Sequence, residues 1–268
     1  MRLLMAVVLA AGLLTAACGD PAGESILDKD TLVVGVRPDL PSLGLRRPDG
    51  TFEGFDIDVA RYVAGKLGKD VRFVPVLAAD RIPFLRDRKA DLVLATLSVT
   101  QERKTRIAFA GPYYTSYQDV MVRAEETDVK EVRDLRGRRF CAVEGADPTR
   151  RLLALHGMSA RLVAAKDYDQ CMSLIRSKAV DAITTNDVIL AGLVRRHDRI
   201  TRLVNVRISE QNTGIGIRQG DPDGCVALNR AITQMYQDGT ARRFVSKWFG
   251  GTGLDTSIVQ VPQFEGCD

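Results

Sequence analysis

Apolar residues along this chain fall into two kinds of segment that follow one another in order. Residues 31–36 form a compact apolar run, which is typical of a buried strand in a parallel sheet. Over residues 55–67 the apolar positions recur at helical spacing, and Asp56 and Asp58 fall in the first turn, where the helix dipole favours acids. Residues 71–76 return to a strand pattern. This succession predicts a βαβ unit and a parallel sheet.

A second series of strands and helices begins after residues 119–123. Asp147 and Pro148 are typical of an N-cap and first position of a helix, which would end at Gly157. A long amphipathic helix is expected over residues 222–237. The other elements of this series are strands at 139–143, 180–185, 203–206 and 213–217 and helices at 168–176 and 187–197. The chain is therefore predicted to be an α/β protein.

An apolar strand at residues 91–96 leads into small hydroxyl residues and then into a charged helix start. Thr96 and Ser98 lie next to the free backbone N–H groups of that helix, which favour an anion. Arg103 adds a planar fork of donors that fits a carboxylate. We predict that Thr96, Ser98 and Arg103 form a carboxylate-binding site. The alternative is an ordinary N-cap at Thr100, with Arg103 as a solvated surface charge.

Residues 1–18 have the pattern of a signal peptide, with a positive start and an apolar run too short for a membrane span. The end of this segment resembles a bacterial lipobox, in which Cys18 is lipidated and becomes the new N-terminus. Thr15 stands where an aliphatic residue is usual. Residues 19–25 would form a short tether. Plain secretion, with Cys18 lost or free, is the alternative.

Four cysteines remain when Cys18 is set aside, and in an exported protein they indicate two disulfides. Three connectivities are possible. The spacing favours local pairs, Cys141 with Cys171 and Cys225 with Cys267.

Composition and charge exclude several classes of function. The 268 residues carry a formal net charge of +4 that is spread along the chain, without a basic stripe and interleaved aromatics, so we expect no nucleic-acid partner. A zinc site at the cysteines is a weaker alternative, because there is no Cys-x-x-Cys and the two histidines, His156 and His197, lack ligand spacing. The sequence has no glycine-rich phosphate-binding loop and no Ser/His/Asp arrangement typical of a catalytic triad. We therefore expect no metal, no cofactor and no enzymatic activity.

Several motifs occur together and in order: Gly54-Phe-Asp-Ile-Asp-Val59, then residues 90–103, 109–114 and 180–192. Through these motifs the chain resembles the family 3 extracellular solute-binding proteins, the polar amino-acid receptors of ABC importers. The resemblance covers roughly residues 30–250.

Within that family the chain looks most like the glutamate-binding lipoproteins of actinobacteria. The similar segments are residues 41–44, 60–67, 95–98 and 110–114, together with the cysteine pair 141 and 171. The resemblance implies a two-lobed periplasmic-binding-protein-like (type II) α/β fold, with two parallel-rich sheets joined by two crossover strands. Lobe 1 would hold residues 26–116 and 215–268, and lobe 2 residues 117–214.

The implied function is that of an extracellular substrate-binding lipoprotein of an ABC importer. It would capture a polar amino acid, glutamate or a similar acid or amide, between two lobes that close by hinge motion. The expected partners are an ABC permease and the membrane surface, reached through the lipid on Cys18, with the protein a monomer on the outer face of the cell membrane. Two other classes stay open: a sensor acting in trans, and a dehydratase or lyase on the same fold.

The resemblance also implies roles for site residues. Arg103 would clamp the α-carboxylate of the ligand, and Thr96 and Ser98 would supply hydroxyl and backbone contacts. Gly145, followed by Ala146, would open the loop of lobe 2 that meets the carboxylate from the other side.

Five further residues have alternative assignments. Arg81 would pair with an acidic side chain of the ligand or be a first-turn surface arginine. Leu43 would line the site with an aliphatic side chain where many relatives have an aromatic ring.

Asp147 stands where the family usually has Thr, and Asn186 where it usually has an Asp that holds the α-ammonium. Asp147 or Asp187 then supplies the missing charge, or the ligand is not a standard α-amino acid. Alternatively, Asp147 only caps its helix and Asn186 still hydrogen-bonds the ammonium.

Overall fold

The computed structural model describes residues 25–197, 200–252, 254 and 262–267. The expected signal peptide, the lipidated Cys18 and residues 19–24 of the tether lie outside the described residues. Within the described ranges, no helix is long and apolar enough to cross a membrane.

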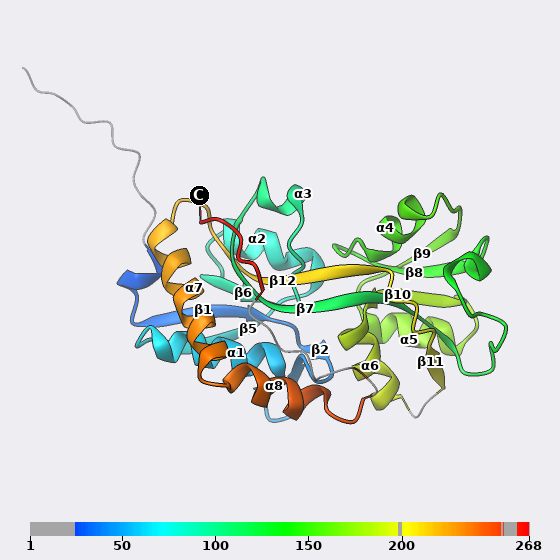
Figure 1. Cartoon of the computed structure of the whole chain (residues 1–268), viewed down its shortest axis with the longest axis horizontal. Helices are drawn as coiled ribbons and strands as arrows, with labels where there is room; N and C mark the ends of the chain where they lie inside the picture. Colours follow the sequence, from blue (N-terminus) through cyan, green and yellow to red (C-terminus); the bar gives the residue numbers. More distant parts are fainter. Residues whose placement is uncertain (1–24, 198–199, 253, 255–261, 268) are drawn as a thin grey trace, which may run out of the picture.

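One nine-stranded sheet runs through the whole molecule (Figure 1). Its order is β5-β1-β6-β12-β7-β10-β8-β9, and β11 pairs with β7. A separate small sheet has the order β2-β3-β4. The strands are β1 (Thr31–Val36), β2 (Asp39–Leu40), β3 (Gly44–Arg46), β4 (Phe52–Glu53), β5 (Asp70–Pro75), β6 (Leu92–Leu94), β7 (Ala108–Arg123), β8 (Arg139–Val143), β9 (Arg161–Ala165), β10 (Ala182–Asn186), β11 (Thr201–Leu203) and β12 (Ser209–Ile217).

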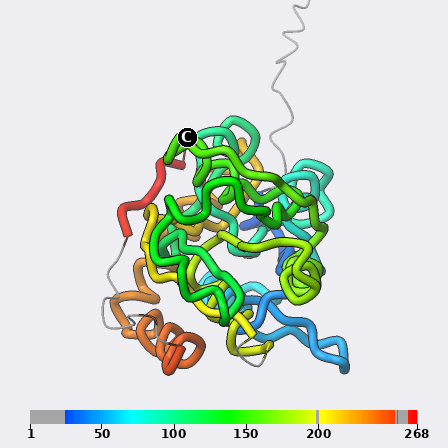
Figure 2. Tube along the Cα trace, turned by 90° about the vertical axis from the view of Figure 1, so that its right-hand side faces the viewer, coloured from blue at the N-terminus to red at the C-terminus, as the bar shows by residue number. Residues whose placement is uncertain are grey.

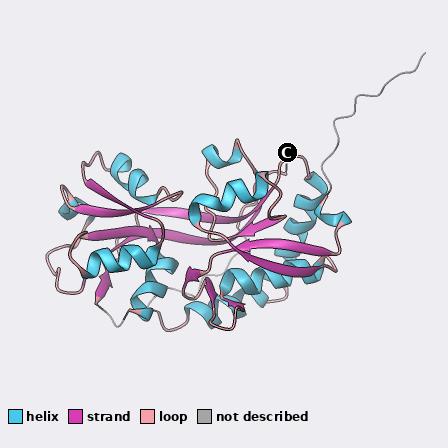
Figure 3. Ribbon diagram, turned by 180° about the vertical axis from the view of Figure 1, so that it is seen from behind, coloured by secondary structure: helices cyan, strands magenta, loops and turns pink. Residues whose placement is uncertain are grey.

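Helices cover both faces of the large sheet (Figure 3). The α-helices are α1 (Phe55–Lys66), α2 (Arg81–Arg86), α3 (Gln101–Lys104), α4 (Pro148–Leu155), α5 (Tyr168–Arg176), α6 (Asp187–Arg196), α7 (Pro222–Gln237) and α8 (Thr240–Phe249). Three short 3-10 helices are η1 (Ile26–Asp28), η2 (Ala78–Asp80) and η3 (Val132–Leu135).

The large sheet consists of two parallel groups held together by two antiparallel strands. In the first lobe β1 pairs in parallel with β5 and β6, and in the second lobe β8 pairs in parallel with β9 and β10. Strands β7 and β12 pair with each other and connect the two groups. The predicted two-lobed type II fold is therefore confirmed, with its two parallel-rich sheets fused into one continuous sheet. The proposed lobe boundaries, after residues 116 and 214, fall inside β7 and β12.

Strand β7 is longer than the sequence pattern indicates. Residues 119–123 were named from the sequence only as the segment before the second series, whereas β7 extends over all sixteen residues of Ala108–Arg123. Gly111 and Pro112 break the usual strand pattern, because Pro lacks a backbone donor. The pairing with β12 continues on both sides of this position, with a register irregularity between Thr213 and Ile215. The tertiary partner, rather than local preference, makes this segment one strand.

The glycine before α1 explains part of the first-lobe packing. Gly54 has φ of 137°, and a Cβ at this position would lie 2.1 Å from the carbonyl oxygen of Leu43. Only glycine, which has no Cβ, allows the backbone at residue 54 to lie this close to the Leu43 carbonyl. The start of α1 then buries Phe55 in an aromatic cluster, with its ring centroid 5.2 Å from those of Tyr114 and Phe249.

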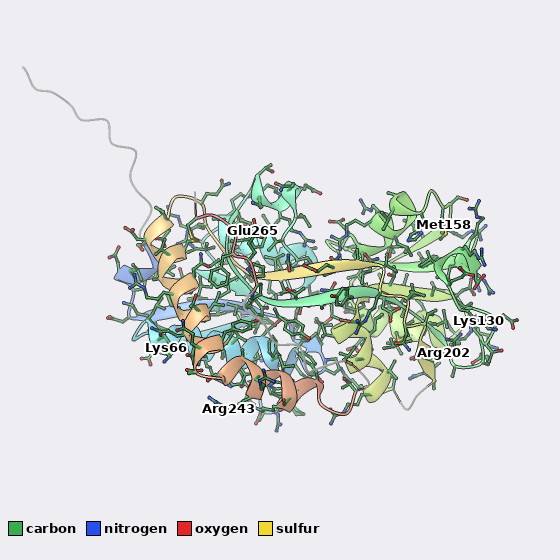
Figure 4. All side chains as sticks on the ribbon, viewed as in Figure 1. Lys66, Lys130, Met158, Arg202, Arg243 and Glu265 are labelled. Carbon is green, nitrogen blue, oxygen red and sulfur yellow. A yellow bond between two sulfur atoms is a disulfide. The ribbon has the colours of Figure 1, made fainter. Side chains whose placement is uncertain are left out.

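Both ends of the described chain attach to α7. The hydroxyl of Ser25 donates to the Asp221 carboxylate, 2.7 Å away, at the N-terminus of α7. At the other end a disulfide joins Cys267 to Cys225 of α7. The C-terminal segment also carries Glu265, which lies beside the first lobe (Figure 4) and whose backbone N–H donates to a carbonyl of β7.

Seen from the end of the second lobe, α8 and the hairpin of β3 and β4 lie at opposite sides (Figure 2).

The second disulfide lies in the other lobe. It joins Cys141 of β8 to Cys171 of α5, with a Cα–Cα distance of 5.7 Å. Both cysteines are buried. The bond therefore fastens a strand of the sheet to the helix that covers it.

Replacing both cysteines of this pair should destabilise the protein. The bond closes a loop with a sequence separation of 30, so its loss gives the unfolded chain more freedom. We expect Cys141→Ser/Cys171→Ser to lower the free energy of unfolding by about 2–4 kcal/mol in urea titrations. Adding a reductant to the wild type should give a similar loss, and equal stability of the variant and the wild type would contradict this role.

A partly buried ion network holds the far end of the second lobe. Both oxygens of the Asp181 carboxylate accept hydrogen bonds from Arg139, at 2.7–3.0 Å, and one accepts from Arg123 at 3.3 Å. These donors hold the pKa of Asp181 far below its usual range. Asp181 follows the turn before β10, so the network fixes the position of that strand.

The Asp181 network predicts a particular dependence of stability on pH. Because the pKa of Asp181 is lower in the folded protein, its stabilisation is present above the unfolded pKa of about 4 and is lost as the pH falls below it. Asp181→Asn should lower the free energy of unfolding by about 2–3 kcal/mol at pH 7. In urea titrations the difference from the wild type should shrink below about pH 4. A difference that does not change with pH would show that the carboxylate charge is not the cause.

Candidate ligand-binding site

A polar pocket lies between the two lobes, where the carboxyl ends of β1, β6, β8 and β10 meet. Ligands of open α/β sheets commonly bind at such strand ends. The cavity itself has a volume of about 20 Å³. Its lining residues are Arg37, Arg81, Thr96, Ser98, Arg103, Ala146, Asp147, Pro148, Arg151, Tyr168, Thr185, Asn186 and Ile189.

Arg103 is buried at the centre of the site. The Thr100 hydroxyl caps α3 by accepting from the backbone N–H of Arg103, and this turns the arginine side chain inward. Nη1 donates to the Ser98 carbonyl at 2.8 Å, and Nη2 donates to the Gly145 carbonyl at 3.3 Å. The alternative hypothesis expected a cap at Thr100 and a solvated Arg103. The cap is present, but Arg103 is only 7% exposed, so its assignment as a solvated surface charge is wrong.

Arg81 is a second buried cation. It is 4% exposed and donates to the carbonyls of Ala78, Ala95, Thr96 and Gly145. Burial lowers the pKa of its guanidinium, with the neighbouring charge of Arg103 acting in the same direction. Within the described part of the chain, no carboxylate forms an ion pair with it. Its alternative assignment, a surface arginine, is therefore excluded.

Thr96 is held in an unusual backbone conformation by Asp56. Its φ is 48°, which is rare for a β-branched residue. One oxygen of Asp56 accepts from the Thr96 backbone N–H at 2.8 Å and from its hydroxyl at 3.0 Å, and the other accepts from the Tyr113 hydroxyl at 2.8 Å. Burial raises the pKa of Asp56 to about 6, against the opposing effect of these donors. Asp56 of α1 is thus a positioning residue, where the sequence indicated only a first-turn acid.

The second lobe faces these residues with Asp147 and Arg151, at either end of the first turn of α4. The Asp147 carboxylate lies 3.7 Å from Nη2 of Arg103 and makes no capping hydrogen bond to its own helix. Arg151 donates to Gln211 at 2.6 Å. Its Nε is buried and has no hydrogen-bond partner among the described residues.

The far wall of the pocket is formed by β10 and by the start of α5. Asn186 is buried, and its amide donates to the Ser116 hydroxyl at 3.1 Å. The Tyr168 hydroxyl donates to the Thr185 hydroxyl at 2.7 Å. The Tyr168 ring also lies 5.9 Å from the guanidinium of Arg37.

The structure brings most of the predicted site residues together. Those that line the pocket are Arg81, Thr96, Ser98, Arg103, Ala146, Asp147 and Asn186. Gly145 reaches the site through its carbonyl oxygen and lines an adjoining pocket. Leu43 is buried in the core, and Asp187 hydrogen-bonds the backbone of Val188, so neither lines the pocket. Burial raises the pKa of Asp187 to about 6. Their assignment as ligand contacts is corrected accordingly.

Several lining residues were missed by the sequence reasoning. Arg37 directly follows β1 and Thr185 lies at the end of β10, so their place at strand ends was an available signal. Arg151 lies four residues after Asp147, on the same face of α4. Tyr168 and Ile189 carried no such signal.

The pocket is strongly cationic. Four arginines and one aspartate line it, and Arg37 is neutralised by a bidentate ion pair with Asp39 just outside the lining. Convergent guanidinium groups fit carboxylates. No cluster suited to a metal ion occurs among the described residues. His156 and His197 do not line the pocket.

Known proteins resemble this chain along most of its length. The glutamate-binding protein GluB of Corynebacterium glutamicum is 29% identical over 268 aligned residues, which cover 93% of this chain and 89% of GluB. The glutamine-binding protein GlnH of Bacillus subtilis is 28% identical and covers 90% of this chain and 94% of its own.

Solved structures agree with the fold. An ancestral arginine-binding protein bound to arginine matches with a TM-score of 0.77 and 28% identity, over 83% of this chain and 99% of that chain. AncCDT-1, an ancestral amino acid-binding protein and a precursor of cyclohexadienyl dehydratase, matches with a TM-score of 0.76 and 28% identity, over 84% of this chain and 100% of that one.

The sequence pattern of one family covers residues 32–251, which include most of both lobes and every residue that lines the pocket. The chain therefore belongs to the bacterial extracellular solute-binding proteins, family 3.

Proposed function

We propose that this protein is the lipid-anchored receptor of an ABC importer and that it captures a polar amino acid, glutamate or a similar acid or amide. The observation that carries the proposal is the pair of buried guanidinium groups, Arg81 and Arg103, in a pocket between two lobes. A buried cation is costly unless an anion accompanies it. Asp147 lies 3.7 Å from Nη2 of Arg103, and no carboxylate pairs with Arg81 among the described residues, so a ligand carboxylate would supply the missing second anion.

The charge of the pocket favours an acidic ligand over a basic one. Arg81 and Arg151 have no ion pair with a carboxylate in the described part of the chain, and both lie within the lining. A cationic side chain there would meet repulsion in a site that excludes water. The resemblance to a glutamate-binding protein and a glutamine-binding protein supports the same range of ligands.

Two glycines of the second lobe allow the lobes to close on the ligand. A Cβ at Gly145 would lie 2.4 Å from the Cα of Ala79, and a Cβ at Gly192 of α6 would lie 2.4 Å from the carbonyl oxygen of Pro41. Ala79 and Pro41 both belong to the first lobe. The Gly145 carbonyl also accepts from Arg81 and Arg103 across the cleft. Closure therefore depends on backbone-to-backbone contact on two sides of the pocket.

Outside the pocket, the proposal includes a lipid on Cys18, an ABC permease as the partner of the closed form, and a monomeric protein on the outer face of the membrane. These parts rest on the lipobox-like segment and on the family to which the chain belongs.

A thermal-shift screen of the twenty amino acids tests the proposed ligand. A ligand at one hundred times its dissociation constant stabilises the folded state by about 2.7 kcal/mol, which gives a clear rise in Tm. We expect glutamate, or an acid or amide like it, to give such a rise. No response to any of the twenty would reject the proposal, and release of a chemically changed ligand would indicate an enzyme instead.

Arg103→Ala should abolish binding without unfolding the protein. Loss of a charged contact that is desolvated on closure costs about 2–5 kcal/mol, which is about 30-fold or more in Kd. Calorimetric titration with glutamate measures the change, and Arg133→Ala, an exposed arginine of the second lobe, serves as the control. An affinity within threefold of the wild type would remove Arg103 from the site.

Gly192→Ala should weaken binding by obstructing closure. Alanine favours the helical conformation over glycine, so the free protein should lose no stability, while the added methyl group meets Pro41 in the closed form. If the closed fraction falls tenfold, the apparent Kd rises about tenfold. The matched control is Gly65→Ala in α1, where a Cβ would meet no atom within 4 Å. Equal Kd values for the two variants would show that this contact does not limit closure.

A further inference from the structure

Asp147 is the one acidic side chain among the described residues that line the pocket. It occupies the N-cap position of α4, yet its side chain forms no capping hydrogen bond. Its carboxylate instead faces Arg103 across the cleft, at 3.7 Å from Nη2. That distance exceeds a hydrogen bond, and the side chain remains 32% exposed. The carboxylate is therefore available to a ligand.

The opposite wall offers no negative charge. Asn186 is neutral and buried, and its amide group is directed to the Ser116 hydroxyl. The Thr185 hydroxyl accepts from Tyr168 and so has its own hydrogen left to donate. The nearest acid along the chain, Asp187, lies outside the pocket lining. An ammonium group placed at this wall would meet amide and hydroxyl dipoles, without a counter-charge.

From these positions we infer that Asp147 binds the α-ammonium of the ligand while Arg103 binds its α-carboxylate, an inference that rests on the proposed amino-acid function. The two ligand groups sit on one carbon atom, and the two protein groups sit 3.7 Å apart with matching opposite charges. Without an ammonium between them, a carboxylate on Arg103 would face the like charge of Asp147. The pair therefore recognises the zwitterionic end of an amino acid as a unit.

This orientation directs the ligand side chain toward Arg151. Nε of Arg151 is buried without a partner among the described residues and lines the pocket. A buried donor of this kind costs free energy until an acceptor reaches it. Arg37 and the Thr185 hydroxyl lie in the same lining. A side-chain carboxylate satisfies these donors, so the inferred ligand is an acidic amino acid whose side chain lies among Arg151 of α4, Arg37 after β1 and Thr185 of β10.

The test compares L-glutamate with glutarate, which has the same two carboxylates and no ammonium. Calorimetric titrations of the wild type, Asp147→Asn and Asn186→Asp are run on the full exported protein. We expect Asp147→Asn to raise the Kd for glutamate about tenfold or more and to leave the Kd for glutarate unchanged or lower. Asn186→Asp adds a negative charge beside the side-chain carboxylate, so it should weaken both ligands by a similar factor.

The opposite pattern would overturn the inference. If Asn186→Asp tightens binding of glutamate but not of glutarate, the ammonium lies at Asn186. If Asp147→Asn leaves the Kd for glutamate unchanged, Asp147 does not bind the ammonium. If the wild type binds glutarate more tightly than glutamate, the ligand carries no ammonium. Binding of glutamine or another amide in place of glutamate overturns the inference and leaves the proposed function intact. Binding of no amino acid at all rejects both. Thermal unfolding of each free variant excludes loss of folding as the cause.

Discussion

The cleft is organised by two buried guanidinium groups that share one backbone carbonyl. Arg81 and Arg103 come from the first lobe, and both donate to the Gly145 oxygen of the second lobe. A carbonyl dipole compensates only part of two charges in a place from which water is excluded. Asp147, 3.7 Å from Nη2 of Arg103, supplies one negative charge, so a ligand anion would complete the compensation of the two guanidinium groups. Under the proposed function, attraction between the lobes and affinity for an acidic ligand would be two effects of the same charge.

The first-lobe part of the site could be predicted because its residues lie close together in the sequence. Thr96, Ser98 and Arg103 follow one apolar strand, and the helix start after it gives a local physical reason for an anion site. The burial of Arg81 could not be predicted in this way. It depends on carbonyls from three different segments, and the sequence cannot show that these converge.

The second-lobe part was predicted less completely for a similar reason. The family resemblance supplied the positions of Asp147 and Asn186, but the direction in which each side chain points depends on tertiary contacts. The sequence allowed Asp147 to be a helix cap, whereas the structure directs it to Arg103. Leu43 and Asp187 were placed in the site by analogy and lie outside its lining. The fold was easier to predict, because the alternation of strands and helices is periodic along the chain, while β7 needed its partner strand to become continuous.

The attachment of both chain ends to α7 determines which part of the molecule moves relative to a surface. Ser25 and Cys267 are fixed at opposite ends of the sequence to the same first-lobe helix, so the second lobe is an insertion within the first. A lipid at Cys18, as proposed, would then attach the membrane to the first lobe. Opening and closing would swing the second lobe alone. A transporter below would sense the ligand as a change in the position of that lobe.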